Sequence, residues 1–346
     1  MHFHDTIIYV LSYKGVSCVS WFEKGENREG IISMNEPRTA QSSSSQLMDS
    51  TSSSGVKALW TDFLALIKIG IVNSNLMTAF AGFWLALFYT NQTFSGNWVA
   101  FVGMMVGTAF VIAGASVLNN YYDRDIDHLM SRTEKRATIT GTIPLKVVLG
   151  MGIAFSAIGM ITLYAVSPAA AFFGFFGWFV YVFLYTMWSK RKYTINTVIG
   201  CFSGAAPPLI GWAAVDSTLH PAAFVLFLVM FLWQIPHFLS LAMMKKEEYG
   251  KANVPMLPVV YGNGITKRQI FIYTICLLPL PFYFASLGTI FLVFSTLLTI
   301  GWVILAFKGF RTKDDTKWAR KMFIYSLNYL TLFFIGLVIA TIPSFI

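Results

Sequence analysis

The sequence predicts an all-α, polytopic membrane protein with nine transmembrane helices, and three features lead to this fold class. Hydrophobic residues make up 56% and charged residues only 12% of the 346 residues, a balance typical of membrane proteins rather than soluble domains. From residue 62 onward, apolar runs of about 20 residues, the length that crosses a hydrocarbon core, follow one another in quick succession. The third feature is the placement of the cations between these runs.

The apolar runs define the expected helices. They cover residues 66–89, 98–118, 145–165, 168–188, 194–214, 221–243, 269–287, 289–307 and 322–342. The break between the seventh and eighth runs, near Gly288, is the least distinct of the boundaries.

The cations predict the orientation of the chain. All 25 Lys and Arg residues either precede or open the first run, or lie in the connection after an even-numbered run. The positive-inside rule therefore places the N-terminus and these loops in the cytoplasm, and the C-terminus outside. One helix more or fewer would break this partition. The net charge of +9 thus reflects topology, and we expect no nucleic-acid partner.

The chain divides into two parts. Residues 1–61 include the serine-rich tracts QSSSSQ and STSSS, which predict a disordered cytoplasmic extension. Residues 62–346 form the membrane domain. Because Met34 opens a plausible short cytosolic tail, we expect translation to begin there and residues 1–33 to be an upstream artefact, which the intact mass of the native protein tests.

A polar stretch after the second run, NNYYDRDIDHLMSRTEKRATITGTIP (119–144), carries the clearest chemical signal. Asn119, Asp123 and Asp127 recur at i, i+4 and i+8, so a continuing helix stacks them along one face. Carboxylate and amide oxygens suit Mg²⁺, which shares its ligands with phosphates. We call these three residues the acidic row and expect it to be the metal site.

Cations near the acidic row are candidate diphosphate contacts, because guanidinium and ammonium groups suit phosphate oxygens. These candidates are Lys68, Arg132, Arg136, Lys190 and Arg191. Glu247 and Glu248 offer a second carboxylate pair across a cytoplasmic-side cavity. The alternative for the stretch is a solvated connection, and for each loop cation an ordinary positive-inside residue.

The spaced acidic row at the end of a membrane helix resembles the first aspartate-rich motif of the UbiA superfamily of intramembrane prenyltransferases. Several further stretches are similar to the branch of that family that prenylates haem. These are NNYYDRDIDHLMSRT (119–133), YTMWSKRKYTINTVIG (185–200), GAAPPLIGW (204–212), WQIPHFLSLA (233–242) and EEYGKANVPMLPVVYG (247–262).

The resemblance implies a nine-helix bundle around a central cavity, open to lipid and capped on the cytoplasmic side. It implies that farnesyl diphosphate binds through Mg²⁺ to the acidic row, with Lys190 as a further catalytic residue. It also implies haem B as the acceptor substrate, haem O as the product, and haem A synthase as a downstream partner in the cell membrane. Candidate residues on the haem side are His237, Gln234, Glu248 and Tyr249.

Two departures from the family pattern stand out. Glu248-Tyr249 replaces the usual Asp-Tyr, which leaves a second metal in doubt, and Ala137 stands where Arg-Pro is common. His237 is either a haem-iron ligand or a hydrogen-bonded structural histidine. The alternative functions are prenylation of a quinone-precursor aromatic acid and, in another class, a membrane transporter or haem-handling protein.

Overall fold

The structure is a computed structural model that describes residues 58–131 and 133–342. Residues 1–57, Arg132 and residues 343–346 lie outside the described residues, so the expectations for residues 1–33 and for Arg132 are not addressed by it. Residues 62–346 form one compact unit, and the description below concerns that unit.

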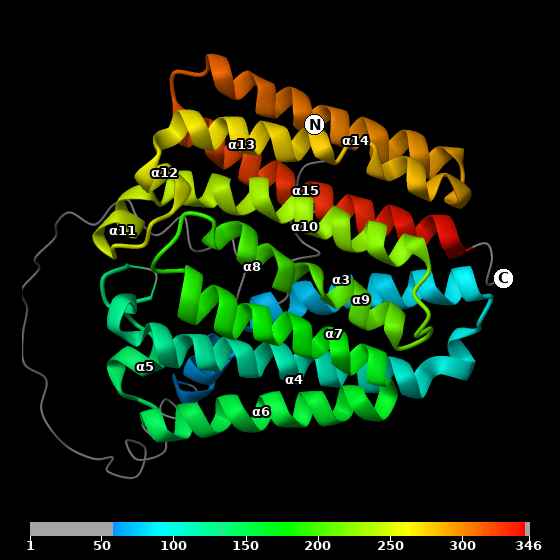
Figure 1. Ribbon diagram of the computed structural model, residues 1–346, viewed down its shortest axis with the longest axis horizontal. Coiled ribbons are helices and arrows are strands. Elements are labelled where there is room, and N and C mark those ends of the chain that lie inside the picture. The colour runs from blue at the N-terminus through cyan, green and yellow to red at the C-terminus, as the bar shows by residue number, and fades with distance from the viewer. Residues whose placement is uncertain (1–57, 132, 343–346) are drawn as a thin grey trace, which may run out of the picture. The chain divides into compact units, whose positions relative to one another are not determined.

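The described part of the chain is built from helices (Figure 1). The long ones are α3 (Ile69–Thr90), α4 (Phe94–Asp127), α6 (Leu145–Val166), α7 (Pro168–Phe179) continuing as the π-helix η1 (Val180–Ser189), α10 (Pro221–Met244), α13 (Gly262–Cys276) followed by η2 (Leu280–Leu287), α14 (Thr289–Lys308) extended by η3 (Gly309–Arg311), and α15 (Asp315–Thr341). The shorter ones are α5 (Ala137–Thr140), α8 (Asn196–Ala205), α9 (Pro207–Ala213), α11 (Lys246–Lys251) and α12 (Leu257–Val260).

Eight helices of the described residues are long and apolar enough to cross a membrane. The remaining predicted crossing, at residues 194–214, is a broken helix formed by α8 and α9. It breaks at Pro207 and Pro208, because proline lacks the N–H that would continue the helix and is tolerated in a first turn. The polytopic all-helical fold is therefore confirmed, with one crossing interrupted.

The boundary near Gly288, the least distinct in the sequence, is a break between two helices. Gly288 has φ 109°, a left-handed conformation that favours glycine, and it separates η2 from α14. Thr93 begins α4 by accepting a hydrogen bond from Gly96, and the helix runs on to Asp127. The polar motif up to that residue is thus helical.

Close backbone approach holds α3 against α9. A Cβ atom on Gly82 would lie 2.0 Å from the carbonyl oxygen of Pro208, and one on Gly211 would lie 1.9 Å from that of Ala79. Small residues at such crossings let membrane helices pack by van der Waals contact. The broken crossing is therefore fixed to α3.

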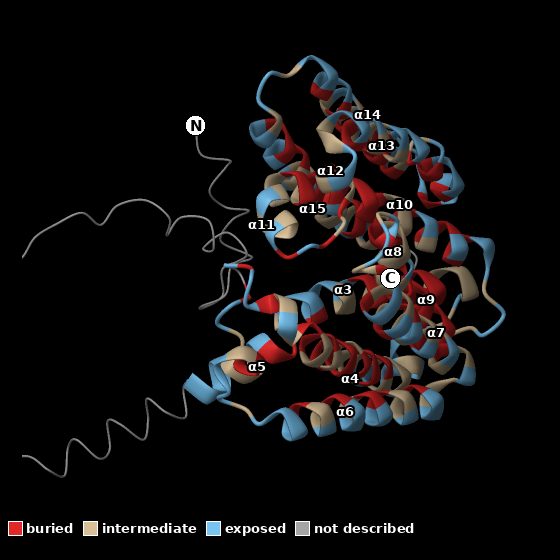
Figure 2. Ribbon diagram, turned by 60° about the vertical axis from the view of Figure 1, so that its left-hand side comes forward, coloured by how far each residue is buried: buried red, intermediate tan, exposed pale blue. Residues whose placement is uncertain are grey.

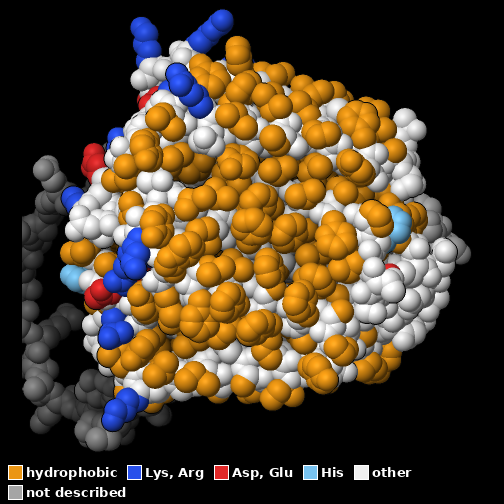
Figure 3. Space-filling model, viewed as in Figure 1, with side chains coloured by type: hydrophobic (Ala, Val, Ile, Leu, Met, Phe, Trp, Pro, Cys, Tyr) orange, Lys and Arg blue, Asp and Glu red, His pale blue; other side chains and the backbone are white. Residues whose placement is uncertain are grey.

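Buried and exposed side chains are distributed as expected for a bundle in lipid. The interior faces of the helices are buried (Figure 2), with Trp212, Trp302 and Tyr329 among the largest fully buried side chains. Hydrophobic side chains cover the middle of the visible surface, whereas Lys and Arg gather at the end where α5, α11 and α12 lie (Figures 1 and 3). The acidic row lies toward that charged end, because α4 leads directly into the loop that carries α5.

Candidate active site

The last turns of α4 carry the acidic row on one buried face. Asn119, Asp123 and Asp127 are only 3%, 0% and 1% exposed. Nδ2 of Asn119 donates a hydrogen bond to Oδ2 of Asp123 at 2.7 Å, as neighbours four residues apart on a helix can do. The helix therefore places the three oxygen-bearing side chains together.

Each member of the acidic row is paired with a cation from another segment. Nζ of Lys68 donates to the amide oxygen of the first member. Nζ of Lys190 contacts Oδ2 of the middle member, and Nη1 of Arg136 lies 2.5 Å from Oδ2 of the last. Since a carboxylate removed from water is costly unless it is paired, these contacts permit the burial of the row.

Lys68 reaches the row because the first spanning segment breaks at this residue. Its φ and ψ of 53° and 55° are left-handed, a strain of about 1–3 kcal/mol for a residue other than glycine. The break separates a helix that ends at Leu66 from α3. The Asn120 amide donates to the Leu66 carbonyl at 2.8 Å, which secures this break to α4.

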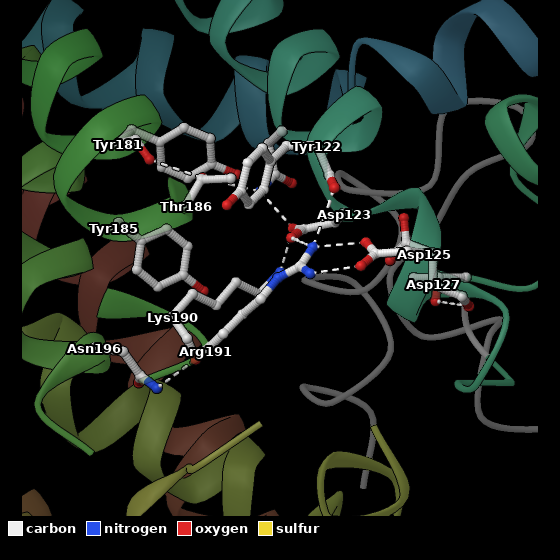
Figure 4. Close-up of polar contacts among 12 residues, drawn as sticks. Tyr122, Asp123, Asp125, Asp127, Tyr181, Tyr185, Thr186, Lys190, Arg191 and Asn196 are labelled. Atoms are coloured by element: carbon white, nitrogen blue, oxygen red, sulfur yellow. Dashed lines mark hydrogen bonds and ion pairs between the residues drawn. The ribbon is translucent and has the colours of Figure 1, made fainter. Parts of the chain in front are cut away.

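Lys190 is delivered by the π-helix η1. Its backbone N–H donates to the carbonyl of Tyr185, five residues earlier, at 2.9 Å. π-Helical turns occur often at functional sites because they shift the register of the side chains. Thr186 Oγ1 accepts a hydrogen bond of 3.0 Å from Asn119, so this unusual turn packs directly on the acidic row (Figure 4).

Two tyrosines of η1 lie beside the two lysines. The rings of Tyr181 and Tyr185 stack with centroids 5.6 Å apart. Lys68 Nζ lies 5.8 Å from the Tyr181 centroid, and Lys190 Nζ lies 6.0 Å from the Tyr185 centroid. The paired cations therefore adjoin an aromatic surface, which attracts positive charge.

The loop after α4 holds the last member of the row. Thr133 Oγ1 donates to the backbone carbonyl of Asp127 at 2.6 Å, and the Arg136 N–H donates to the Thr133 carbonyl at 3.1 Å. These bonds turn the chain so that the Arg136 guanidinium faces Asp127.

Arg191 makes contacts that the sequence did not reveal. Its guanidinium forms a two-pronged ion pair with Asp125, with N–O distances of 2.6 and 2.7 Å, and lies 3.3 Å from Oδ1 of Asp123. The Asp125 carboxylate, through this hydrogen bond, raises the pKa of Arg191 above its ordinary value. Asp125 lies two residues from Asp123 and so off the face of the acidic row, which is why the i, i+4 spacing passed over it.

The donor set fits a magnesium ion that shares its coordination with a phosphate. No cluster of three or more His, Cys, Asp or Glu side chains suited to a metal occurs among the described residues, because the row supplies two carboxylates and one amide. Mg²⁺ commonly takes one or two carboxylates and completes its shell with substrate phosphates and water. The row is therefore suited to a metal–diphosphate complex rather than to a cage built of protein ligands alone.

The second carboxylate pair lies on a different segment from the row. Glu247 is exposed, and Glu248 is paired with Lys245 Nζ at 2.7 Å. A small hydrophobic cluster nevertheless joins the two loops, because Met130 packs with Val254 and its neighbours. Tyr249 packs against this cluster.

His237 and Gln234 are buried among helices. The His237 imidazole stacks between Trp233 and Phe323, with centroids 4.9 and 4.6 Å away, and its Nδ1 lies 2.7 Å from Oγ of Ser326. The Gln234 amide donates to the carbonyl of Met230 at 3.1 Å. These contacts favour the structural alternative for His237, and a haem-side role for either residue stays a prediction.

Known proteins share both the sequence and the fold. The model of the UbiA prenyltransferase family matches residues 75–327. The chain is 54% identical over 283 residues to protoheme IX farnesyltransferase 2 of Bacillus subtilis, covering 82% of this chain and 93% of that relative. It is 53% identical over 291 residues to protoheme IX farnesyltransferase of a Geobacillus species, covering 84% and 94%.

Solved structures of lower identity show the same fold. The chain matches a digeranylgeranylglyceryl phosphate synthase with a TM-score of 0.65 at 18% identity, covering 82% of this chain and 99% of that one. It matches a UbiA homolog from Archaeoglobus fulgidus bound to DMAPP and Mg²⁺ with a TM-score of 0.57 at 17% identity, covering 78% and 99%. The predicted family and fold are thus confirmed, and the chain belongs to the UbiA prenyltransferase family.

Proposed function

We propose that this chain transfers the farnesyl group of farnesyl diphosphate to a vinyl group of haem B, giving haem O for terminal oxidases. The observation that carries the proposal is the acidic row with its paired cations, in a chain 54% identical to a relative named for this reaction. The reaction takes place in the cell membrane, with the N-terminus and the active-site loops in the cytoplasm and the C-terminus outside. The described Lys and Arg side chains visible in Figure 3 gather at one end of the molecule, which supports this orientation.

Several site residues contribute to the proposed binding of farnesyl diphosphate. When bound, Mg²⁺ neutralises charge on the diphosphate and stabilises it as a leaving group. Lys68, Lys190 and Arg136 hold phosphate oxygens, because each ends beside the row where such oxygens would lie. Preorganised cations of this kind stabilise the negative charge that develops as the bond breaks. Arg132 completes the proposed set of phosphate contacts, whereas the terminal nitrogens of Arg191 are directed at Asp125.

The chemistry of transfer is a substitution through an allylic cation. The C1–oxygen bond of farnesyl diphosphate breaks, and its electron pair leaves with the diphosphate. The vinyl group of haem B donates its π electrons to C1, and water then adds to the resulting cation and loses a proton, giving a hydroxyethylfarnesyl group. Tyr181 and Tyr185 lie beside the lysines and offer ring faces to the positive charge.

The acceptor half of the site is proposed from the sequence pattern. Haem B occupies the central cavity, with His237, Gln234, Glu248 and Tyr249 on its side. Haem A synthase is the proposed partner that takes up haem O. We also propose that residues 1–61 form a cytoplasmic extension.

A membrane assay tests the proposal directly. Membranes that contain the protein are supplied with haem B, farnesyl diphosphate and Mg²⁺, with and without a chelator, and extracted haem is analysed by mass spectrometry. Appearance of haem O that the chelator abolishes is the expected result. If haem stays unmodified while 4-hydroxybenzoate or dihydroxynaphthoate is prenylated, the quinone-precursor alternative replaces the proposal. If neither acceptor reacts, a transporter or haem-handling protein takes its place.

A further inference from the structure

We propose that Asp125 is a positioning residue that uses Arg191 to hold Lys190 against Asp123, and that Arg191 acts as this tie rather than as a phosphate ligand. The inference rests on the proposed diphosphate site and deepens it. It assigns a role to a carboxylate outside the acidic row, and it changes the role expected for Arg191.

Both terminal nitrogens of the Arg191 guanidinium donate hydrogen bonds to α4. Nη1 donates to Oδ2 of Asp125 at 2.6 Å, and Nη2 donates to Oδ1 of Asp125 at 2.7 Å. Nη2 also donates to the Tyr122 carbonyl at 3.1 Å and to Oδ1 of Asp123 at 3.3 Å. Nε is buried and has no hydrogen-bond partner, so a phosphate oxygen would have to bind at the terminal nitrogens, where it competes with the Asp125 carboxylate.

The flat face of the same group is also covered. Its central carbon lies 4.9 Å from the centroid of the Tyr122 ring, a distance at which a guanidinium stacks on an aromatic face. Figure 4 shows Arg191 extended across the site toward Asp123 and Asp125, beside Lys190. Edge contacts and face contacts together define one orientation for the side chain.

The position of Arg191 affects Lys190 because these two residues are consecutive in the chain. The backbone of Lys190 is already held within its own segment, by its bond to Tyr185 and by Asn196 Nδ2, which donates to its carbonyl at 3.2 Å. Those bonds fix the shape of the segment, and the hydrogen bond from Asn119 to Thr186 joins η1 to α4 one turn earlier. The ion pair between Asp125 and Arg191 adds a contact with α4 directly beside Lys190 and so helps to set where its ammonium ends.

The ion pair between Asp125 and Arg191 acts by orienting the two side chains rather than by burying charge. Asp125 is 60% exposed and Arg191 28% exposed at the side chain, so the ion pair adds little to folding stability. A two-pronged contact nevertheless specifies orientation as well as distance. We therefore expect its loss to change ligand affinity more than stability.

The test compares Asp125→Asn with Arg191→Gln in the full-length protein. Both variants should raise KM for farnesyl diphosphate about tenfold, the size of one misplaced charge-assisted contact, and should also lower kcat, because Lys190 is then misplaced for the charge that develops on the leaving group. The double variant should be no worse than either single variant, because both act through one pair. Arg191→Lys should resemble Arg191→Gln, since an ammonium cannot form the fork, whereas Asp125→Glu should recover part of the loss.

A direct phosphate contact by Arg191 predicts a different pattern. Asp125→Asn would then release the guanidinium toward phosphate and leave KM unchanged or lower, while Arg191→Gln alone would raise it. Arg191→Lys would retain most of the affinity. Either of these results would overturn the proposal.

Arg124→Gln is the matched control. Arg124 lies between Asp123 and Asp125 in the sequence, but its Nη1 donates to the Tyr121 carbonyl at 2.6 Å and its guanidinium covers the Tyr121 ring. This variant removes a positive charge, as Arg191→Gln does, from the turn of α4 that carries Asp125, and it should leave KM unchanged. Elution as a single species in detergent and an unchanged thermal midpoint show that each variant is folded.

Calorimetric binding of inorganic pyrophosphate with Mg²⁺ gives a second readout that needs no haem. Asp125→Asn and Arg191→Gln should each weaken it about tenfold. If the wild-type protein binds pyrophosphate but transfers no farnesyl group to haem, the proposed function fails while this inference is still tested. If both variants bind pyrophosphate as the wild type does, the inference fails by itself.

Discussion

The ammonium group of Lys190 contacts Oδ2 of Asp123, the same oxygen that accepts a hydrogen bond from Asn119. A proposed metal ligand and a proposed phosphate ligand are thus joined to each other. The same holds for Arg136 with Asp127. In the proposed site, a metal would compete with the cations for these carboxylates, and a diphosphate would compete with the carboxylates for the cations. Binding of either ligand would therefore release a group that binds the other.

Asp123→Asn should abolish farnesyl transfer by removing one of the two carboxylates of the acidic row, while the protein still inserts in the membrane. The change should also release Lys190, so that inorganic pyrophosphate binds about tenfold more tightly than to the wild type when no metal is present. Calorimetry in chelator checks the affinity, and mass spectrometry of extracted haem checks turnover. Full activity in this variant would refute the metal-site assignment.

Because each ligand would release a side chain that binds the other, we expect metal and diphosphate to bind cooperatively. Mg²⁺ should raise the affinity for pyrophosphate by about tenfold or more, and pyrophosphate should raise the affinity for Mg²⁺ by the same factor, as linkage requires. Four calorimetric titrations, of each ligand with and without a saturating concentration of the other, measure the two factors. In Lys190→Gln, metal alone should bind more tightly than to the wild type, because the competitor of Asp123 is gone. Independent binding of the two ligands would contradict this expectation.

His237→Leu should lower the free energy of unfolding by about 1–2 kcal/mol, since it removes an aromatic stack and a buried hydrogen bond. The expected readout is a lower thermal midpoint of the purified protein in detergent. The Soret band of haem added to the protein should be the same in wild type and variant. A shifted band would show that the imidazole ligates iron, and Ser326→Ala, which removes the Oγ partner of Nδ1, serves as the milder control.

Gly211→Ala should destabilise the bundle, because its Cβ would lie 1.9 Å from the carbonyl oxygen of Ala79 and force α9 away from α3. Overpacking of this kind costs about 1–3 kcal/mol or more. Gly150→Ala, on α6, meets nothing within 4 Å of its new Cβ and should be neutral in the same assay. Equal thermal midpoints for the two variants would contradict the role given to the α3–α9 contact.

The sequence by itself determined the class of fold and the identity of the acidic row. Membrane helices are readable from sequence because lipid requires long apolar segments whose backbone hydrogen bonds are internal. The row is readable because i, i+4 spacing on a single helix is a local property. The family followed from five stretches between Asn119 and Gly262, each of which is a continuous run of sequence.

Tertiary structure decided which cation faces which oxygen. Lys68 lies 51 positions before Asn119, and Arg191 lies 66 positions after Asp125, so no spacing rule connects them. The left-handed break at Lys68 and the π-helical register at Lys190 depend on packing against α4, which local sequence does not encode. The sequence left open whether His237 is a ligand or a structural residue. Its stacking partner Phe323 lies on a helix 86 residues away (237 to 323), so local sequence could not show the contact. Local periodicity determines which side chains share one face of a helix, whereas helix packing determines which residues of other segments that face contacts.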